Sequence, residues 1–170
     1  MTLEQLAYLA EIVGVILVVA SLAYVARQLR QNTDAILAQS RQSILAASHS
    51  ELSMTIANPQ MTVQLTLDSP LTPEENVRLG AWLYATFRAR EFAWLQYQNG
   101  VIDETQWQTE LAVIQFFLDS TKVRRWWSAV GHAAYGTDFA GFVHGEIAST
   151  EPTDTTFRAM VGWNEAEHAA

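Results

Sequence analysis

The chain of 170 residues contains no cysteine, and only four prolines and eight glycines. Without cysteine it can form neither a disulfide nor a zinc–thiolate or iron–sulfur centre, and it has no thiol nucleophile. The absence of cysteine also agrees with a domain in the reducing cytoplasm. Because proline and glycine are scarce, most of the chain is free to be helical.

Basic residues are scarce as well, with ten Lys and Arg against eighteen Asp and Glu and a net charge of −8. Binding to a phosphate backbone requires a basic stripe, so we expect no nucleic-acid partner. The sequence also lacks the glycine-rich phosphate loop, the dinucleotide fingerprint and the Gly-x-Ser-x-Gly nucleophile motif. Its four histidines match no spacing of metal ligands. We therefore expect no catalysis, no cofactor and no metal site.

The longest apolar run lies near the N-terminus, and no basic residue precedes Arg27. The 21 residues 6–26 carry a single charge, that of Glu11. As a helix they would extend roughly 31 Å, close to the thickness of the hydrocarbon core of a bilayer. Glu11 would reach one headgroup layer, and Tyr24, Arg27 and Arg30 would mark the other membrane interface. We expect a membrane-spanning helix; a buried core helix and a cleaved signal peptide are the alternatives.

The residues that flank this run predict its orientation. Arg27, Arg30 and Arg41 follow it, whereas the segment before it holds no basic residue. By the positive-inside rule, the N-terminus lies outside a bacterial inner membrane and the domain that follows lies in the cytoplasm. Ala10 and Gly14 are four positions apart, and small residues at this spacing let membrane helices pack closely. We therefore expect some self-association through this face.

Helical periodicity and end signals divide the chain into four parts. Residues 1–30 are predicted to form the membrane helix with its basic flank, and 31–57 a stalk helix that continues it. Residues 58–150 form an aromatic-rich helical bundle, and 151–170 a loosely attached acidic tail. The predicted fold is therefore all-α.

Capping signals place the helices of the bundle. Thr72 begins a long apolar helix that ends at the pair Asn99 and Gly100, and Asp103 caps the next helix. Residues 61–67 are ambiguous because apolar and polar side chains alternate, as in a strand. No second segment could pair with such a strand, so we favour a short helix there.

Arg88 and Glu91 stand three positions apart on the long apolar helix, where they can share a face. Charged groups on a mostly buried helix must be paired or hydrated, so we expect a buried ion pair or a hydrated face. The alternative is that the two residues frame a site for an anionic ligand. Arg90 points away from this pair.

A second candidate is the cluster of Arg124, Arg125, Trp126 and Trp127. Indole rings favour the headgroup layer and guanidinium groups bind phosphate, so the cluster suits contact with membrane lipid or with a partner. The alternative is that one tryptophan belongs to the core and the arginines are hydrated.

Several segments together carry a resemblance to known sequences. They are the apolar run 10–26, Arg-Gln-Leu-Arg-Gln-Asn-Thr at 27–33, Leu-Thr-Pro-Glu-Glu at 71–75, Gln-Tyr-Gln-Asn-Gly at 96–100 and Arg-Trp-Trp at 125–127. With them the chain resembles a widespread family of uncharacterised bacterial proteins that have one N-terminal transmembrane helix and a small helical domain. The resemblance implies this architecture and assigns no catalytic residue.

These features predict a membrane-anchored helical scaffold or accessory subunit that contacts membrane lipid and binds a protein partner or a second copy of itself. The alternative is a membrane-tethered sensor that binds a small or lipid-like ligand between its aromatic helices. A sensor should have an apolar pocket lined by Trp82, Trp94 or Trp107. A scaffold should have a filled core and an exposed apolar patch.

Overall fold

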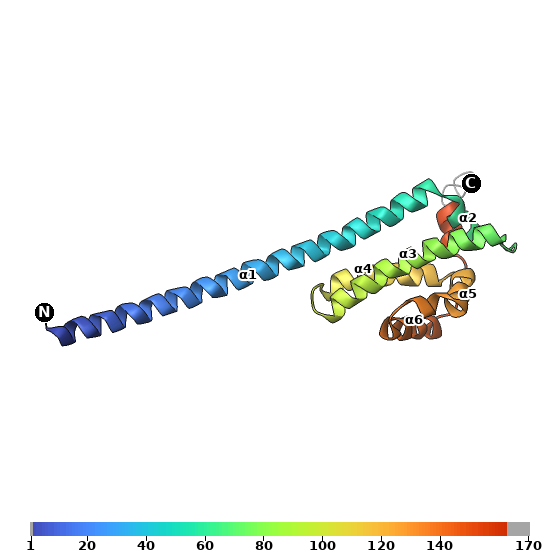
Figure 1. Cartoon of the computed structure of the whole chain (residues 1–170). Coiled ribbons are helices and arrows are strands. Elements are labelled where there is room, and N and C mark those ends of the chain that lie inside the picture. Colours follow the sequence, from blue (N-terminus) through green and yellow to red (C-terminus); the bar gives the residue numbers. More distant parts are fainter. Residues whose placement is uncertain (1, 163–170) are drawn as a thin grey trace, which may run out of the picture. The chain divides into compact units, whose positions relative to one another are not determined.

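The structure is a computed structural model and describes residues 2–162 (Figure 1). Every regular element in this range is a helix, which confirms the all-α prediction. The first helix, α1 (Leu3–Ala57), is continuous, but the chain divides into two compact units at Ser40. Each unit is described by itself below.

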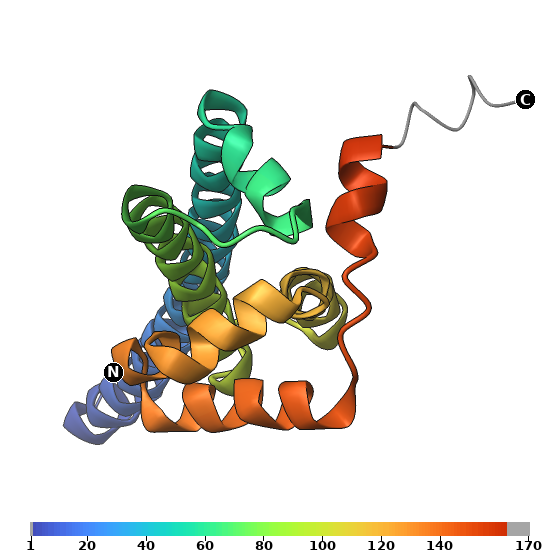
Figure 2. The same cartoon turned by 90° about the vertical axis from the view of Figure 1, so that its right-hand side faces the viewer.

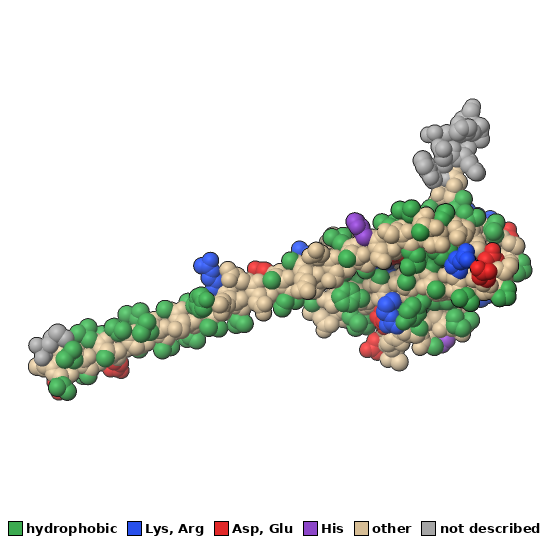
Figure 3. Space-filling model, turned by 45° about the horizontal axis from the view of Figure 1, so that its top comes forward, with side chains coloured by type: hydrophobic (Ala, Val, Ile, Leu, Met, Phe, Trp, Pro, Cys, Tyr) green, Lys and Arg blue, Asp and Glu red, His purple; other side chains and the backbone are tan. Residues whose placement is uncertain are grey.

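The first unit consists of α1 up to Ser40, and none of the residues of α1 is buried. Its most apolar window has a mean hydropathy of 2.4 and is 0 % buried, which argues against a core helix of this chain. Hydrophobic side chains cover this part of the helix on the face seen in Figure 3. By length and composition, α1 is the one described helix that could cross a membrane. The predicted interface and packing residues are exposed except for Gly14, which is partly buried. The exposed ones are Ala10, Glu11, Tyr24, Arg27 and Arg30.

The second unit begins at Arg41 and contains the end of α1 and the remaining helices. They are α2 (Gln60–Thr66), α3 (Pro73–Gln98), α4 (Glu104–Leu118), α5 (Thr121–Ala129), the 3₁₀ helix η1 (Gly131–Ala134), α6 (Thr137–Ser149) and α7 (Thr156–Gly162). The ambiguous segment 61–67 is therefore helical up to Thr66. Helix α3 packs along α4, and α2 packs against α7 (Figure 2).

Local sequence signals explain where the two central helices begin. Thr72 accepts a hydrogen bond from the Glu75 amide, and the Glu75 carboxylate accepts one from the Thr72 amide in return. Asp103 and Gln106 form the same reciprocal box at the start of α4. These boxes satisfy backbone donors that a helix N-terminus otherwise leaves unpaired. The predicted start and end of α3 are confirmed.

Aromatic rings contact one another throughout the core of the second unit. Phe87 on α3 lies 5.0 Å from the Trp127 ring and 6.4 Å from the Phe117 ring, measured between centroids. Trp127 also stacks on Tyr135 at 5.1 Å. Trp127 is 0 % exposed and Phe87 1 %. Rings packed edge to face and offset in this way contribute beyond their buried area.

The sequence predicts a loosely attached tail over 151–170, but residues 151–162 are held to the domain by hydrogen bonds. Asp119 accepts hydrogen bonds from the backbone and hydroxyl groups of Thr153 and Thr156 and from the Thr155 amide. Asp154 in turn accepts from the amide and hydroxyl of Thr121, at the start of α5. This reciprocal network holds residues 151–162 against the domain. Residues 163–170 lie outside the described residues.

The network at Asp119 brings α7 into the core. Phe157 is 3 % exposed and lies 4.7 Å from the Phe116 ring and 5.4 Å from the Phe117 ring, between centroids. Burial alone would raise the pKa of Asp119, but the hydrogen bonds from Thr156 and Thr153 outweigh burial and lower this pKa well below its usual value. The last described helix is therefore part of the folded domain.

Candidate functional site

The strongest candidate site is a half-open, apolar cavity of about 550 Å³, here called the Arg90 cavity. It lies between the C-terminal part of α1 and helices α2, α3, α4 and α7. Its lining residues are Ser48, Glu51, Leu52, Thr55, Thr62, Trp82, Arg90, Thr109, Glu110, Ala112, Val113, Phe116, Phe117, Phe157 and Met160. All of them belong to the second unit.

Three charged side chains from three helices meet in this cavity. Arg90 Nη2 lies 2.7 Å from Glu51 Oε2, and Arg90 Nη1 lies 2.9 Å from Glu110 Oε2. The side chains are 5 %, 14 % and 11 % exposed respectively. Such burial is costly for ions unless their hydrogen bonds are complete.

The hydrogen bonds of this triad are incomplete. Glu110 Oε2 is paired with Arg90 Nη1, so the missing partners lie elsewhere in the site. Arg90 Nε has no acceptor within residues 2–162. Two neutral lining groups, Thr62 Oγ1 and Trp82 Nε1, are also buried without a partner in the described chain. Burial raises the pKa of the Glu110 carboxyl, Arg90 partly opposes this, and Glu51 adds to it.

Sequence reasoning missed this triad, although it correctly expected Arg90 to point away from the pair of Arg88 and Glu91. Its acidic partners lie 39 and 20 positions from it along the chain, so helix spacing could not connect them. One signal was present in α4, where Trp107, Glu110, Ile114 and Phe117 recur at core spacing and are all buried. A carboxylate on a core-facing stripe indicates a buried charge that needs a partner.

The predicted pair of Arg88 and Glu91 does form, but only half of it is buried. Glu91 is 8 % exposed and Arg88 is 44 % exposed. Glu91 also accepts a hydrogen bond of 2.7 Å from the Gly136 amide at the start of α6. The Arg88 guanidinium lies over the rings of Tyr84 and Tyr135, at 5.2 and 4.8 Å from their centroids.

The donors of Arg88 are used within the domain. It donates to the Ala134 carbonyl at 2.5 Å and to the Tyr84 hydroxyl at 2.9 Å. The Tyr84 hydrogen bond raises the pKa of Arg88, and burial raises the pKa of Tyr135. This pair therefore joins α3 to η1 and α6 and has its polar groups satisfied, as a structural contact would.

The predicted cluster on α5 is divided by the structure. Trp127 is 0 % exposed, so it belongs to the core, as the alternative expected for one of the two tryptophans, and it is not available to lipid or a partner. Arg124 donates to the carbonyls of Leu118, Ile147 and Thr150 and closes the end of α6. Its guanidinium is thus occupied inside the domain.

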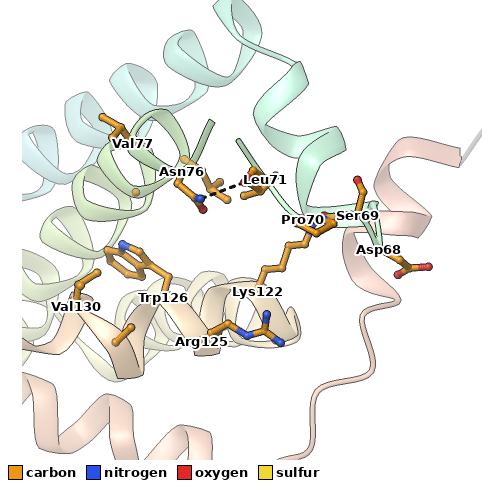
Figure 4. A pocket seen from close by; sticks show the side chains of 13 residues that line it. Asp68, Ser69, Pro70, Leu71, Asn76, Val77, Lys122, Arg125, Trp126 and Val130 are labelled. Carbon is orange, nitrogen blue, oxygen red and sulfur yellow. Dashed lines mark hydrogen bonds between the residues drawn. The ribbon is translucent and has the colours of Figure 1, made fainter. Parts of the chain in front are cut away.

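The other two residues of that cluster line a second cavity of about 590 Å³, shown in Figure 4. Here Trp126 and Arg125 lie near Lys122, whose ammonium donates to the carbonyls of Gln64 at 2.8 Å and Ser69 at 3.3 Å. Burial lowers the pKa of Lys122. Trp126 also packs on Phe87 at 5.7 Å between centroids, so this cavity reaches the aromatic core.

Trp82, Trp94 and Trp107 are the candidates expected to line a ligand pocket. Trp82 lines the Arg90 cavity, and the other two line neither of the cavities described here. Trp94 packs on Phe139 and Phe142 in the core. Trp107 stacks on Tyr97 at 5.4 Å between centroids. In the part of the chain that the structure describes, no group of three or more His, Asp or Glu side chains is placed to hold a metal ion.

An exposed apolar stripe runs along α3. Val77, Tyr84, Phe92 and Leu95 are 74 %, 43 %, 39 % and 45 % exposed. Their spacings of seven, eight and three place them on one face of the helix. Arg88 interrupts this stripe between Tyr84 and Phe92 with an exposed charge.

Comparisons with models of protein families, with curated proteins and with solved structures give no match. The site must therefore be interpreted from its own geometry, and the resemblance to a family of membrane-anchored bacterial proteins stays a prediction.

Proposed function

We propose that this protein is a single-pass protein of a bacterial inner membrane whose helical domain binds a small amphipathic ligand in the Arg90 cavity. The N-terminus lies outside and the domain lies in the cytoplasm. The observation that carries this proposal is a half-open cavity in which aromatic and aliphatic side chains surround the ion pairs of Arg90 with Glu51 and Glu110. Ligand sites combine an apolar lining with a few convergent polar atoms in this way.

The volume of the cavity supports the same conclusion. A space of about 550 Å³ lies in the range of sites that hold small molecules, roughly 300–1,000 Å³. Phe116, Phe117 and Phe157 supply apolar surface, and Arg90 with Glu110 supplies polar atoms that orient a ligand. Because Glu51 belongs to α1, ligand in this cavity would contact the same helix that carries the membrane span.

Native mass spectrometry of the full chain, extracted in mild detergent, tests the proposal. We expect a non-covalent small-molecule adduct on the wild-type protein that is lost in an Ala112→Trp variant. Ala112 is exposed and lines the cavity, so the indole would occupy it without disturbing the core. Ala148→Trp, on an exposed position of α6 away from the cavity, is the matched control. Equal adducts on both variants, or none on the wild type, would contradict the proposal.

The exposed stripe on α3 favours a second candidate, the membrane-anchored scaffold or accessory subunit. Val77, Tyr84 and Leu95 could bury apolar surface against a protein partner or a second copy of the chain. Light scattering of the full chain in nanodiscs tests self-association. Leu95→Lys should convert an oligomer to a monomer, and a wild-type monomer would contradict self-association through this stripe.

The orientation has its own test. Reporter fusions to the C-terminus should be active only when the reporter folds in the cytoplasm. Activity of a reporter that requires the opposite compartment would reverse the proposed topology.

A further inference from the structure

The second cavity, of about 590 Å³, lies between α5, the first turns of α3 and residues 68–71, and is here called the Trp126 cavity. Figure 4 shows Lys122 and Arg125 extending toward one side of this cavity, with Trp126 and Val130 on the other. The cavity therefore has a cationic end and an apolar end. Its volume lies in the range of small-molecule sites, roughly 300–1,000 Å³.

The cationic end has N–H groups that nothing in the described chain accepts. A lysine ammonium has three N–H groups, and Lys122 uses two of them on the carbonyls of Gln64 and Ser69. The exposed Arg125 guanidinium forms no hydrogen bond or ion pair within residues 2–162. The indole N–H of Trp126, a half-buried residue, likewise has no acceptor among the described residues. A ligand rich in acceptor oxygens would complement this end.

The acidic residue that lines the Trp126 cavity is already paired. Asp68 Oδ1 accepts a hydrogen bond of 2.9 Å from Arg158, and Figure 4 shows the Asp68 carboxylate pointing away from Lys122. Asp154 and Glu75 also act on Lys122, but neither lines the cavity and both accept hydrogen bonds from threonines. The charge that faces a ligand therefore favours an anion.

The apolar end is fixed in position by two glycines that lie close to Trp126. A Cβ on Gly131 would lie 2.8 Å from the Trp126 ring, and a Cβ on Gly80 would lie 3.4 Å from its Nε1. Phe87 packs on the same ring at 5.7 Å between centroids. Because the backbone and Phe87 enclose the indole, it forms a wall of the cavity that exists before any ligand binds.

We propose that the Trp126 cavity binds an amphipathic phosphate, whose phosphate oxygens accept N–H groups of Arg125 and Lys122 and whose apolar body lies against Trp126. A phosphate offers several acceptor oxygens, and a guanidinium can donate to two of them at once. The same chemistry occurs in the headgroup of an anionic membrane lipid and in a soluble phosphate ester. This inference is independent of the Arg90 cavity.

Three probes separate the phosphate from the apolar body. They are phenyl phosphate, phenol and inorganic phosphate, titrated by calorimetry against the full chain in a maltoside detergent, which contains no phosphate. We expect phenyl phosphate to bind about tenfold more tightly than either of the other two, because it alone contacts both ends of the cavity. Equally tight binding of phenol or of inorganic phosphate would overturn the ligand class.

Two pairs of variants locate the interaction. Arg125→Gln should weaken the binding of phenyl phosphate about tenfold, since it removes the unpaired guanidinium. Arg78→Gln is the matched control, because Arg78 is 45 % exposed and does not line the cavity. Ala129→Trp fills the cavity from an exposed lining position and should abolish binding, whereas Ser128→Trp, on the neighbouring exposed position outside the cavity, should not.

The controls decide between a site and general attraction to positive charge. Equal weakening by Arg125→Gln and Arg78→Gln, or equal binding by the two tryptophan variants, would overturn the proposal. If Arg125→Gln loses its near-ultraviolet circular dichroism, the two tryptophan variants decide.

A short-chain anionic lipid separates the two sources of the ligand. Dihexanoyl phosphatidylglycerol that binds more tightly than phenyl phosphate, and that Ala129→Trp excludes, would support a membrane lipid. Weaker binding of this lipid than of phenyl phosphate would support a soluble phosphate ester.

Discussion

Two arginines on α3, two positions apart, have opposite surroundings. Arg88 is 44 % exposed, lies over two tyrosine rings and has carbonyl, hydroxyl and carboxylate partners. Arg90 is 5 % exposed, binds two glutamates and has an unpaired Nε in the described chain. Because residues two apart on a helix point roughly 200° apart, they serve two sides of α3. The contacts of Arg88 join α3 to neighbouring helices, whereas Arg90 lines the cavity that we propose to be a ligand site.

The largest expected effect is that of Arg90→Ala. It leaves Glu51 and Glu110 buried without their cation, which should destabilise the domain by about 3–5 kcal/mol. Denaturant unfolding of the full chain in nanodiscs, followed by near-ultraviolet circular dichroism of the tryptophans, measures this. A loss below about 1 kcal/mol would show that the triad is hydrated instead of buried.

Asp119→Ala should have the next largest effect and should act on the Arg90 side alone. It removes the hydrogen bonds that hold residues 153–156, and with them Phe157 beside the cavity. We expect a loss of about 2 kcal/mol, since hydrogen bonds to a charged acceptor are among the stronger ones. Hydrogen exchange should rise in α7 and stay unchanged in η1. An equal rise in η1 would contradict a local effect.

Arg88→Ala should cost less than either, about 1 kcal/mol, because its side chain is 44 % exposed and solvent partly screens its ion pair. The loss should appear as faster exchange around Gly136 and Ala134, which Glu91 and Arg88 join to α3. Arg88→Lys should restore little, since a lysine cannot donate to several acceptors in the plane of a guanidinium. A larger loss than that of Arg90→Ala would reverse the comparison.

The smallest expected effect is a pH dependence on the Arg90 side. Burial raises the pKa of Glu110 in the folded state, so the folded protein holds this proton at pH values where the unfolded chain has released it. Glu110 therefore contributes stability at low pH, and this contribution falls as the pH rises from the ordinary glutamate value to the raised one. Unfolding curves across this window should show the slope in the wild type and lose it in Glu110→Gln. An unchanged slope in the variant would assign it to another group.

Local features could be predicted from the sequence, and long-range pairings could not. The ends of α3 followed from Thr72 and Asn99, because caps act within one helical turn. The helix at 60–66 could be predicted because no other segment could pair with a strand there. The Arg90 triad and the Asp119 network join segments at least 20 residues apart, and nothing in helix periodicity selects such partners. Which tryptophan of the α5 cluster is buried could not be predicted for the same reason, since the fold and not the motif decides it.

The most direct test of the central claim replaces the triad with leucines at Glu51, Arg90 and Glu110. Buried ion pairs exchanged for apolar side chains of similar volume commonly leave stability unchanged or increased. If the triad is kept for binding, this variant should unfold within about 1 kcal/mol of the wild type and lose the native adduct. Retained binding with a loss of several kcal/mol would show that the triad serves the fold, and would contradict a ligand site at Arg90.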